Sequence, residues 1–461
     1  MKGLRGEITV FLTLLLLLFL VFFTVLLERL RVEGARTAGE RSLNLGLSSV
    51  FTEYYEPLWK EYHLFGLSPE NLEGRVREYM LLSYGLSCKE LTIEEIVWGT
   101  DYDGKIFLHQ IEAYERYRSG EALLERNFVE KYTEAADKVL AENASKGEAA
   151  LPEDWKGTEE GREERRKMGS LKAVWGRSIM EMVLDNPAEL SAKKLKGGPA
   201  VGEGRYSFSS TRPEKNLGQV KRFLQKRMVE EAELRYYREH FKSYCKKTIE
   251  FQRPNSLLDY ELEYLMEGKK SDRDNMEAWL RRLVLTRTTL NYLMINQDSQ
   301  KSQMAYEMAL TALGFTGLEP LIRAGQQFIL LGWGYEEALV DVCILLQGGQ
   351  VSLWKGAEEF SISFGELFSF SKEMVRRKAR ERKIEGIMDY EAYLSLFLSF
   401  KKEQKRRQAA WYLIDENIRL RYGEEFSLQD TVFGVHMRAE YQLPGKLGRD
   451  WILEAKRHYS Y

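Results

Sequence analysis

The segment ITVFLTLLLLLFLVFFTVLL, residues 8–27, contains no charged residue and decides how the whole chain is organised. As an α-helix rising about 1.5 Å per residue, it would extend about 30 Å, the thickness of a bilayer's hydrocarbon core. The run ends in LLER, residues 26–29, without the small residues at which a secretory signal is cleaved. It also lacks the polar face of a helix in a globular protein. The sequence therefore predicts a retained transmembrane helix. Its anchoring residues are Ile8, Phe11, Leu14, Leu18, Phe22 and Leu27.

Basic residues flank both ends of this helix. Lys2 and Arg5 precede it, and a mixture of arginine and glutamate follows it. The excess of Lys and Arg that marks the cytoplasmic side of a span therefore does not decide the orientation here. A large domain after the span can also cross the membrane regardless of local charge.

The composition of the chain is that of a folded protein. Of its 461 residues, 44% are hydrophobic and 30% are charged, and the scarcity of proline, with nine residues, favours helix. A formal net charge of −2 gives no overall field that would attract nucleic acid. Cys88, Cys245 and Cys343 are far apart and odd in number. We therefore expect buried or free thiols, or one disulfide with a free thiol, and no cysteine metal site.

The spacing of apolar residues predicts a body made mainly of helices. The anchor helix is expected to continue over residues 28–63. Further helices are expected from about 106 to 140, through most of 217–346, and over 371–383 and 389–421.

Strands are expected near both ends of this body. The stretch LTIEEIVW, residues 91–98, is rich in β-branched residues. Apolar residues alternate with polar ones from Phe433 to Tyr441, and residues 451–461 are expected to pair with that strand. Residues 324–335 are apolar but too few to span a bilayer, so they predict a buried core helix. The predicted fold class is α+β and predominantly helical: one N-terminal transmembrane helix continuing into a helix-rich body with a small antiparallel sheet.

These elements predict six successive regions. The first three are a cytoplasmic N-terminus (1–7), the transmembrane helix (8–27), and a membrane-proximal helix with the first part of the α+β body (28–143). The other three are flexible charged and Gly-rich insertions around a short helix (144–216), a helical core (217–383), and C-terminal helices and strands (384–461).

The sequence contains no nucleotide-binding loop, no metalloprotease motif and no serine-hydrolase elbow. The best candidate catalytic pair is Glu337 and Asp341, which are four residues apart and so share one helix face. Paired carboxylates can transfer protons or bind a cation. However, no histidine lies near them in the sequence, and carboxylates at the edge of a helical core are also expected to be salt-bridged. We therefore predict a non-enzymatic protein without cofactor or metal.

Two basic runs form a possible interaction patch. The patch comprises Arg376, Arg377, Lys378, Arg380, Lys405, Arg406 and Arg407. Such runs can bind nucleic acid or anionic envelope polymers. Because no aromatic stacking platform accompanies them, no nucleic-acid partner is expected. Solvated helix faces and, for a body outside the cell, a binding site for anionic wall polymer remain the two interpretations.

Several motifs resemble known families. The opening RGEITVF (residues 5–11), the Leu-rich run and LER (27–29) resemble TadE/TadG-like minor pseudopilins of tight-adherence (Flp) pilus systems. Other motifs resemble a narrower, functionally uncharacterised family of long bacterial proteins with the same start. These motifs are SVFTEY (49–54), YHLFGL (62–67), DYELEYL (259–265), GKKSD (268–272), VSLWK (351–355) and YSY (459–461).

The resemblance covers most of the chain apart from residues 144–215. It implies a single-pass membrane protein whose bulk is extracytoplasmic, with the lipid bilayer and other pilus or envelope proteins as partners. It also implies a possible processing site between Gly6 and Glu7. Pseudopilins of this type usually carry a glutamate inside the apolar run, whereas residues 8–27 of this chain contain none.

The leading prediction is thus a non-enzymatic, single-pass membrane protein of the cell envelope, pseudopilin-like or accessory to a tight-adherence pilus or secretion system. A membrane-tethered adaptor that binds anionic envelope polymers is the first alternative. An enzyme that uses Glu337 and Asp341 is the second.

Overall fold

The computed structural model describes most of the chain in two compact units. The described residues are 4–99, 101, 105–119, 161–195, 219–246, 255–381, 388–423, 426–446 and 450–461. The first unit draws on Met1–Ile111 and Tyr422–Tyr461, and the second on Glu112–Arg205 and Asn216–Arg421. The second unit is thus inserted, in sequence, into the first. Much of the predicted flexible region 144–216 lies outside the described residues, as does the end of the helix predicted to reach residue 140.

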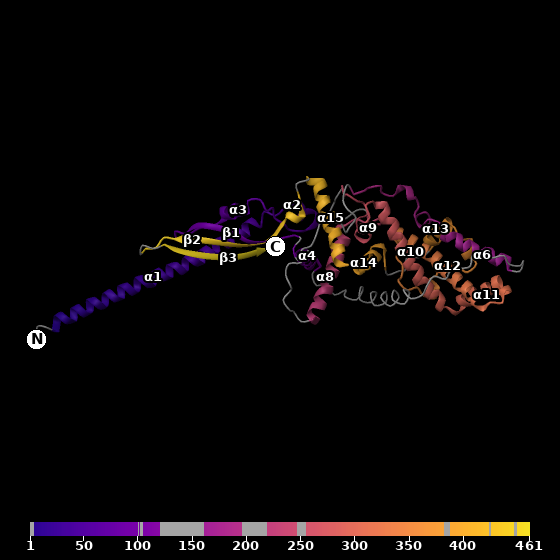
Figure 1. Cartoon of the computed structure of the whole chain (residues 1–461), viewed down its shortest axis with the longest axis horizontal. Helices are drawn as coiled ribbons and strands as arrows, with labels where there is room; N and C mark the ends of the chain where they lie inside the picture. The colour runs from indigo at the N-terminus through magenta and orange to yellow at the C-terminus, as the bar shows by residue number, and fades with distance from the viewer. Residues whose placement is uncertain are drawn as a thin grey trace. The chain divides into compact units, whose positions relative to one another are not determined.

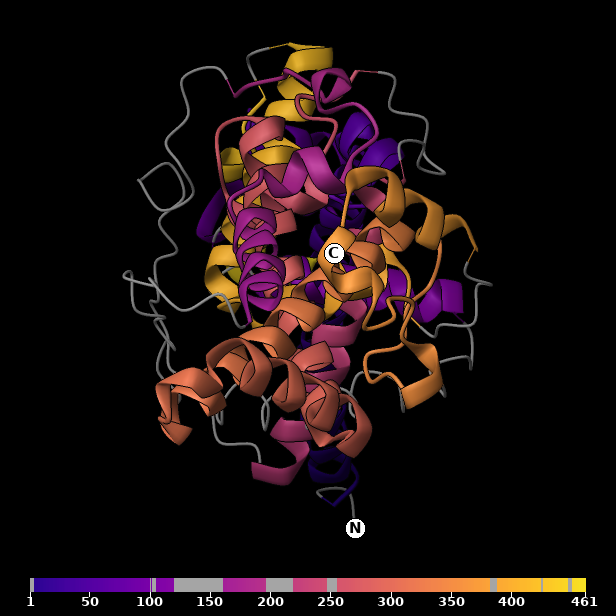
Figure 2. The same ribbon diagram turned by 90° about the vertical axis from the view of Figure 1, so that its right-hand side faces the viewer.

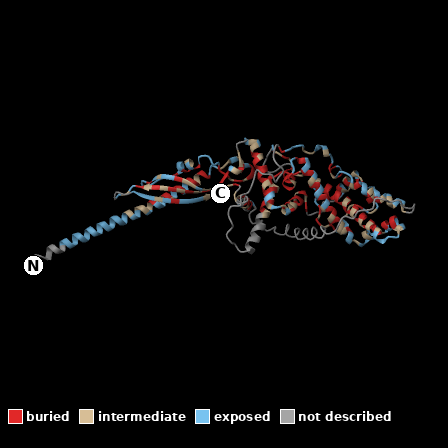
Figure 3. Cartoon of the chain, in the orientation of Figure 1, coloured by how far each residue is buried: buried red, intermediate tan, exposed pale blue. Residues whose placement is uncertain are grey.

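Helix α1 (Leu4–Val50) runs through 47 residues without a break. Every large apolar side chain from Val10 to Leu27 is at least 39% exposed, and Figure 3 shows this half of the helix in pale blue. From Val32 onward one face of α1 joins the core of the first unit. The helix is long and apolar enough to cross a membrane, although a signal sequence near the N-terminus would meet the same criteria.

The second half of α1 lies against a three-stranded antiparallel sheet. The strands are β1 (Ser87–Trp98), β2 (Val432–Leu443) and β3 (Trp451–Ser460), in the spatial order β1-β2-β3. In the registers, Ala439 lies opposite both Leu91 and Ala455. Side chains on β2 alternate between the core and a half-buried face beyond Val435, as expected for a central strand with one face on a core.

Close contacts hold α1 to this sheet (Figure 1). Gly39 lies under the ring of Tyr441, where an added Cβ would come within 2.9 Å of a ring carbon, so the helix and strand approach closely. The Tyr441 hydroxyl donates a hydrogen bond of 2.8 Å to the Gly39 carbonyl. At the far end, the Phe51 ring lies 4.8 Å from the Tyr459 ring and 4.9 Å from the Tyr461 ring, between ring centroids. The helix and sheet therefore form one core.

Short helices complete the first unit. They are α2 (Glu56–Tyr62), α3 (Leu72–Tyr79) and the first part of α4 (Lys105–Ser119). Leu72 and Val76 of α3 are buried beside α1 in the shared core.

The second unit consists of helices packed on one another (Figures 1 and 2). Its helices are α6 (Arg162–Trp175), α7 (Ile179–Val183), α8 (Gln219–His240), α9 (Glu261–Glu267), α10 (Asp272–Gln297), α11 (Ser299–Leu313), α12 (Glu319–Leu346), α13 (Lys372–Glu381), α14 (Tyr390–Phe400) and α15 (Glu403–Tyr422). Helix α12 is buried on most of its surface. Its Gly334 meets α10, where an added Cβ would come within 2.9 Å of the Tyr292 backbone nitrogen.

The predicted fold class is confirmed: the chain is mainly helical, with a long apolar N-terminal helix and a small antiparallel sheet. Both C-terminal strands and the strand at 91–98 are present, and the apolar residues 324–335 form the middle of α12. The continuous helix predicted over 28–63 is wrong, because α1 ends at Val50 and α2 begins at Glu56, with Pro57 in its first turn. The helix predicted over 389–421 divides into α14 and α15.

Candidate functional site

Glu337 and Asp341 lie on α12 and are completely buried. The ammonium of Lys355, also fully buried, stands between them: Nζ is 2.5 Å from Glu337 Oε1 and 2.5 Å from Asp341 Oδ1. Lys355 belongs to the irregular segment that follows α12. The helical spacing of four residues thus aims both carboxylates at one cation.

Arg287 of α10 closes the other side of Asp341. Its Nε and Nη2 donate to Asp341 Oδ2 over 3.1 and 2.8 Å, and Asn291 Nδ2 donates to the same oxygen over 2.9 Å. Burial alone would raise the pKa of Asp341, but the nearby charges of Lys355 and Arg287 lower it to about 2. Asp341 is therefore ionised at neutral pH.

Backbone groups satisfy the second carboxylate. The N–H of Ser361 donates to both oxygens of Glu337, at 2.9 and 3.0 Å, and the N–H of Ile362 donates to Oε2 at 3.0 Å. Arg287 Nη1 similarly donates to the carbonyls of Ser352 and Leu353. The network therefore ties the segment after α12 to α10 and α12. Two carboxylates balance two cations away from solvent, an arrangement that holds structure rather than offering a reacting group to a substrate.

A third carboxyl, Glu336, was not singled out from the sequence. It is fully buried, and none of the described residues donates a hydrogen bond to either carboxyl oxygen. Burial raises its pKa to about 9, so it is protonated at pH 7. The available signal was its position, since Glu336 directly follows the apolar residues 324–335 that predicted a buried core helix.

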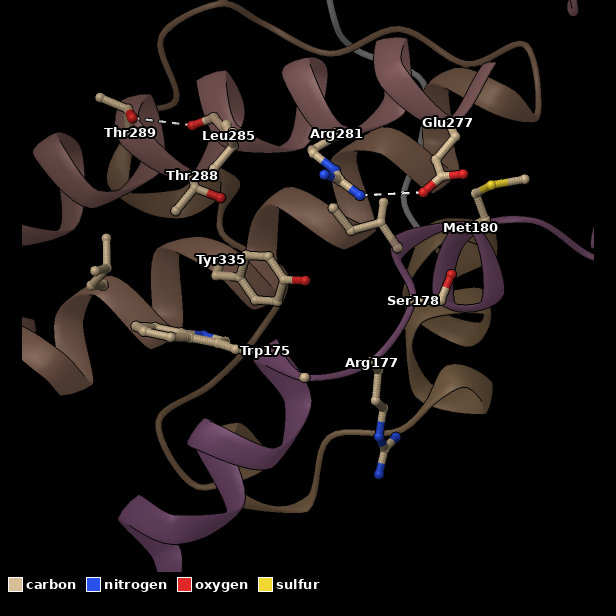
Figure 4. A pocket seen from close by; sticks show the side chains of 13 residues that line it. Trp175, Arg177, Ser178, Met180, Glu277, Arg281, Leu285, Thr288, Thr289 and Tyr335 are labelled. Atoms are coloured by element: carbon tan, nitrogen blue, oxygen red, sulfur yellow. Dashed lines mark hydrogen bonds and ion pairs between the residues drawn. The ribbon is translucent and has the colours of Figure 1, made fainter. Parts of the chain in front are cut away.

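An open cleft of about 720 Å³ lies between α6, α7, α10 and α12 (Figure 4). The rings of Trp175 and Tyr335 adjoin at 6.1 Å between centroids, and Arg281 pairs with Glu277 at 3.2 Å. The hydroxyl of Thr288 donates to a carbonyl of its own helix. The lining contains neither histidine nor cysteine, so this cleft could hold a flat, partly apolar ligand but offers no nucleophile with an adjacent base.

The structure separates the residues of the predicted basic patch. Arg406 and Arg407 are buried: Arg406 Nη2 lies 2.8 Å from Glu233 Oε2, and Arg407 pairs with Glu233 and Glu403. They are therefore removed from any exposed basic surface, because α15 has its charged face turned inward against α8.

The other members of the patch differ in environment. Arg376 pairs with Asp185 and Lys378 with Glu366, whereas Arg380 and Lys405 are exposed. Arg377 is 60% exposed and lies 3.8 Å from both Glu366 and Glu381. Most of these cations thus already have carboxylate neighbours.

The predicted anchoring residues form no cluster of their own but lie along the exposed half of α1. Phe11, Leu14, Leu18, Phe22 and Leu27 are each at least 61% exposed. Gly6 lies within α1, and the side chains of Glu7 and Ile8 are outside the described part of the chain. The hydroxyls of Thr13 and Thr24 donate hydrogen bonds to carbonyls of the same helix, so their hydroxyl hydrogens are already bonded within α1.

Sequence comparison assigns most of the second unit, together with strand β2, to a family. No curated protein matches this chain, and no solved structure matches it. Residues 157–443 match the model of DUF5702, a family of unknown function, over more than half of the chain. The chain belongs to this family, DUF5702.

Proposed function

We propose that this chain is a non-enzymatic, single-pass membrane protein of the cell envelope, with its body outside the cytoplasm. Within that role, we infer a pseudopilin-like or accessory part in a tight-adherence pilus or secretion system. The supporting observation is the division of α1 into two halves. One half exposes a continuous apolar surface, and the other packs on an antiparallel sheet.

The exposed half requires an apolar environment. Each large side chain between Val10 and Leu27 would gain about 1.5–3 kcal/mol if fully removed from water. A surface this apolar all around the helix is suited to lipid or to other apolar helices. Because α1 continues without a break, lipid anchoring would place the sheet directly beside the membrane.

The resemblance to TadE/TadG-like proteins supplies the finer part of the proposal. In such an assembly, the exposed half of α1 would pack against helices of neighbouring subunits, and the body would contact pilus or envelope proteins. DUF5702 membership neither requires nor opposes this role.

The side of the membrane is tested by labelling introduced cysteines with a membrane-impermeant maleimide in intact, wall-stripped cells. Lys456→Cys in the first unit and Lys405→Cys in the second place thiols at exposed positions. Both are made after Cys88, Cys245 and Cys343 are replaced, since Cys88 and Cys245 are partly exposed. Labelling without permeabilisation is expected. Labelling only after permeabilisation would place the body in the cytoplasm and overturn the proposal.

Helix packing is tested with a photo-crosslinking amino acid at Leu18, in cells that express the complete system. The proposal expects adducts with other membrane-embedded proteins. Adducts with lipid alone would leave an anchor but contradict the pseudopilin-like part. The same photo-crosslinking amino acid at Lys405, an exposed position in the body, is the control for incidental contacts.

The two alternative functions receive less support from the geometry. The polymer-binding adaptor loses two of its cations to the buried cluster with Glu233. The enzyme alternative requires Glu337 and Asp341 to meet a substrate, whereas both are shielded from solvent and neutralised by Lys355 and Arg287.

A further inference from the structure

Two connections meet at one end of the sheet in the first unit. Ser87, the first residue of β1, lies opposite Gln442, and Leu443 at the end of β2 lies opposite Trp451 at the start of β3. The segment that leads from α3 into β1 and the β2–β3 hairpin are therefore neighbours. Figure 1 shows the hairpin pointing back along α1, toward its N-terminal half.

Contacts with α1 fix how far this end reaches toward the apolar run. Arg457 Nη2 lies 2.8 Å from Glu40 Oε2, and residues nearer the end of β3 contact Phe51, so β3 and α1 run in the same direction. Trp451 precedes Arg457 by six residues, about 20 Å at ~3.3 Å per strand residue. Leu27 precedes Glu40 by 13 residues, also about 20 Å at ~1.5 Å per helical residue. Trp451 thus lies level with the end of the apolar run.

The segment before β1 lies beside α1 a short distance farther from the apolar run. An added Cβ on Gly34 would lie 3.5 Å from the Tyr84 ring, so that ring sits beside α1 seven residues after Leu27, or about 10 Å along the helix.

Large apolar and aromatic side chains are exposed at this end. Tyr84 is 59%, Trp451 47% and Ile452 65% exposed. We call these three residues the hairpin end. Tryptophan and tyrosine are enriched where membrane and water meet, because their rings are apolar and each carries one polar group. Lys446 in the hairpin turn is also exposed and can reach lipid phosphates.

We propose that the hairpin end docks on the surface of the bilayer that holds α1. The proposal rests on the membrane anchoring inferred above and adds a second contact with lipid, at the headgroup level. The favoured occupant is lipid and not a second copy of the chain, because α1, which lies beside this end, is itself the inferred anchor and brings the hairpin end to the membrane surface. The contact would fix the height of the sheet over the membrane and limit its rotation about α1.

The test uses full-length chain reconstituted in vesicles of phosphatidylethanolamine and phosphatidylglycerol. After the three native cysteines are replaced, a nitroxide spin label is attached at Ile452→Cys, Lys456→Cys or Leu18→Cys. Ile452 and Lys456 are exposed on the same face of β3, and Lys456 lies four residues, about 13 Å, farther along. For each position, the collision rate of the spin label with oxygen, which concentrates in lipid, is compared with its collision rate with a water-soluble nickel complex.

Position 452 is expected to show a several-fold higher ratio of oxygen to nickel-complex accessibility than position 456. Position 18 is expected to show the highest ratio. Tyr84→Cys provides a second reporter of the hairpin end and should show a ratio between those of positions 452 and 456. Thermal unfolding of each labelled variant confirms that the exposed substitution leaves the fold intact.

Two results would overturn the docking while sparing the anchor. Equal aqueous accessibility at 452 and 456, with a lipid signal at 18, would show that the hairpin end stands in water. Shielding of 452 from both reagents would show that protein covers it, as in a dimer. An aqueous signal at position 18 would instead overturn the membrane anchor itself, and with it the proposed function.

Discussion

At the scale of single residues, the ammonium of Lys355 lies 2.5 Å from a carboxylate oxygen of Glu337 and 2.5 Å from one of Asp341. All three side chains are shielded from solvent. Buried ion pairs of this kind add little net stability when complete, since desolvation offsets attraction. Removing one partner is different, because an unpaired charge then remains in the interior.

Replacing Lys355 with methionine should therefore lower the free energy of unfolding by about 3–5 kcal/mol. Chemical denaturation of the purified protein in detergent measures the loss. Lys167→Met is the matched control in the same unit, because Lys167 pairs with Glu163 on the surface and its loss should cost less than about 1 kcal/mol. Equal effects of the two substitutions would mean that the buried network is not intact in solution.

Glu336 predicts a pH dependence of stability. In the folded protein its carboxyl keeps a proton up to about pH 9, whereas the unfolded chain loses that proton near pH 4.3, the ordinary pKa of about 4.3 for glutamate. Between these values the unfolded state binds fewer protons, so the free energy of unfolding falls as pH rises, by at most about 1.4 kcal/mol per pH unit.

Glu336→Gln should remove this slope and make the protein more stable than wild type at pH 8, with little difference at pH 4.5. Urea unfolding of both proteins across that range provides the comparison. Glu358→Gln, at an exposed position, serves as the control. Parallel pH profiles for wild type and Glu336→Gln would contradict the buried, protonated state.

Charge alone could not locate these residues from the sequence. The pairing of Glu337 with a cation was one of two interpretations that the helical spacing allowed, but the cation, Lys355, comes from an irregular segment whose position depends on tertiary packing. The basic patch also could not be judged from charge alone. Arg406 and Arg407 lie in a basic run typical of a solvated helix face, yet they are buried and paired with Glu233 on α8.

At the scale of elements, the contact between α1 and β2 depends on Gly39. A Cβ there would come within 2.9 Å of the Tyr441 ring, which also donates its hydroxyl to the Gly39 carbonyl. Gly39→Ala should destabilise the first unit by about 1–3 kcal/mol, because the ring has to move. This outweighs the gain of roughly 1 kcal/mol that alanine normally brings to a helix.

Gly34→Ala in the same helix is the matched comparison. Its added Cβ would meet the Tyr84 ring at 3.5 Å, an ordinary contact, so alanine should be neutral or stabilising. Thermal unfolding in detergent, followed by circular dichroism, compares the two. A stabilising Gly39→Ala would show that α1 does not approach β2 as closely as described.

Local patterns identified most elements but not all of their ends. Ser271 directly precedes α10, and its hydroxyl accepts a hydrogen bond from the Asp274 N–H, as serine commonly does at a helix start. The end of α1 was missed, because the apolar spacing continues through Phe51 and Tyr54 although the backbone turns there to let Phe51 meet β3. Strand pairing between Leu91 and Ala439 joins residues too distant for local pattern to specify the register.

At the scale of the whole molecule, the apolar half of α1 makes no described contact that the body needs. Removing residues 2–27 should therefore leave a protein that folds and stays in solution without detergent. Its circular dichroism spectrum and thermal midpoint are expected to match those of the full chain, apart from the lost helix. Loss of the cooperative transition would show that the anchor supports the fold as well as tethering it.

The placement of β1 and β2 in the chain also sets an order of events during synthesis. More than 300 residues separate Trp98 from Val432, so at about 5–20 residues per second the ribosome needs roughly 15 to 70 seconds to supply the second strand. The helical unit between them is complete before β2 emerges. The sheet that contains the early strand β1 is thus completed only after the helical unit has been synthesised. Until β2 emerges, the edge of β1 is unpaired and can be occupied by a chaperone or a neighbouring nascent chain.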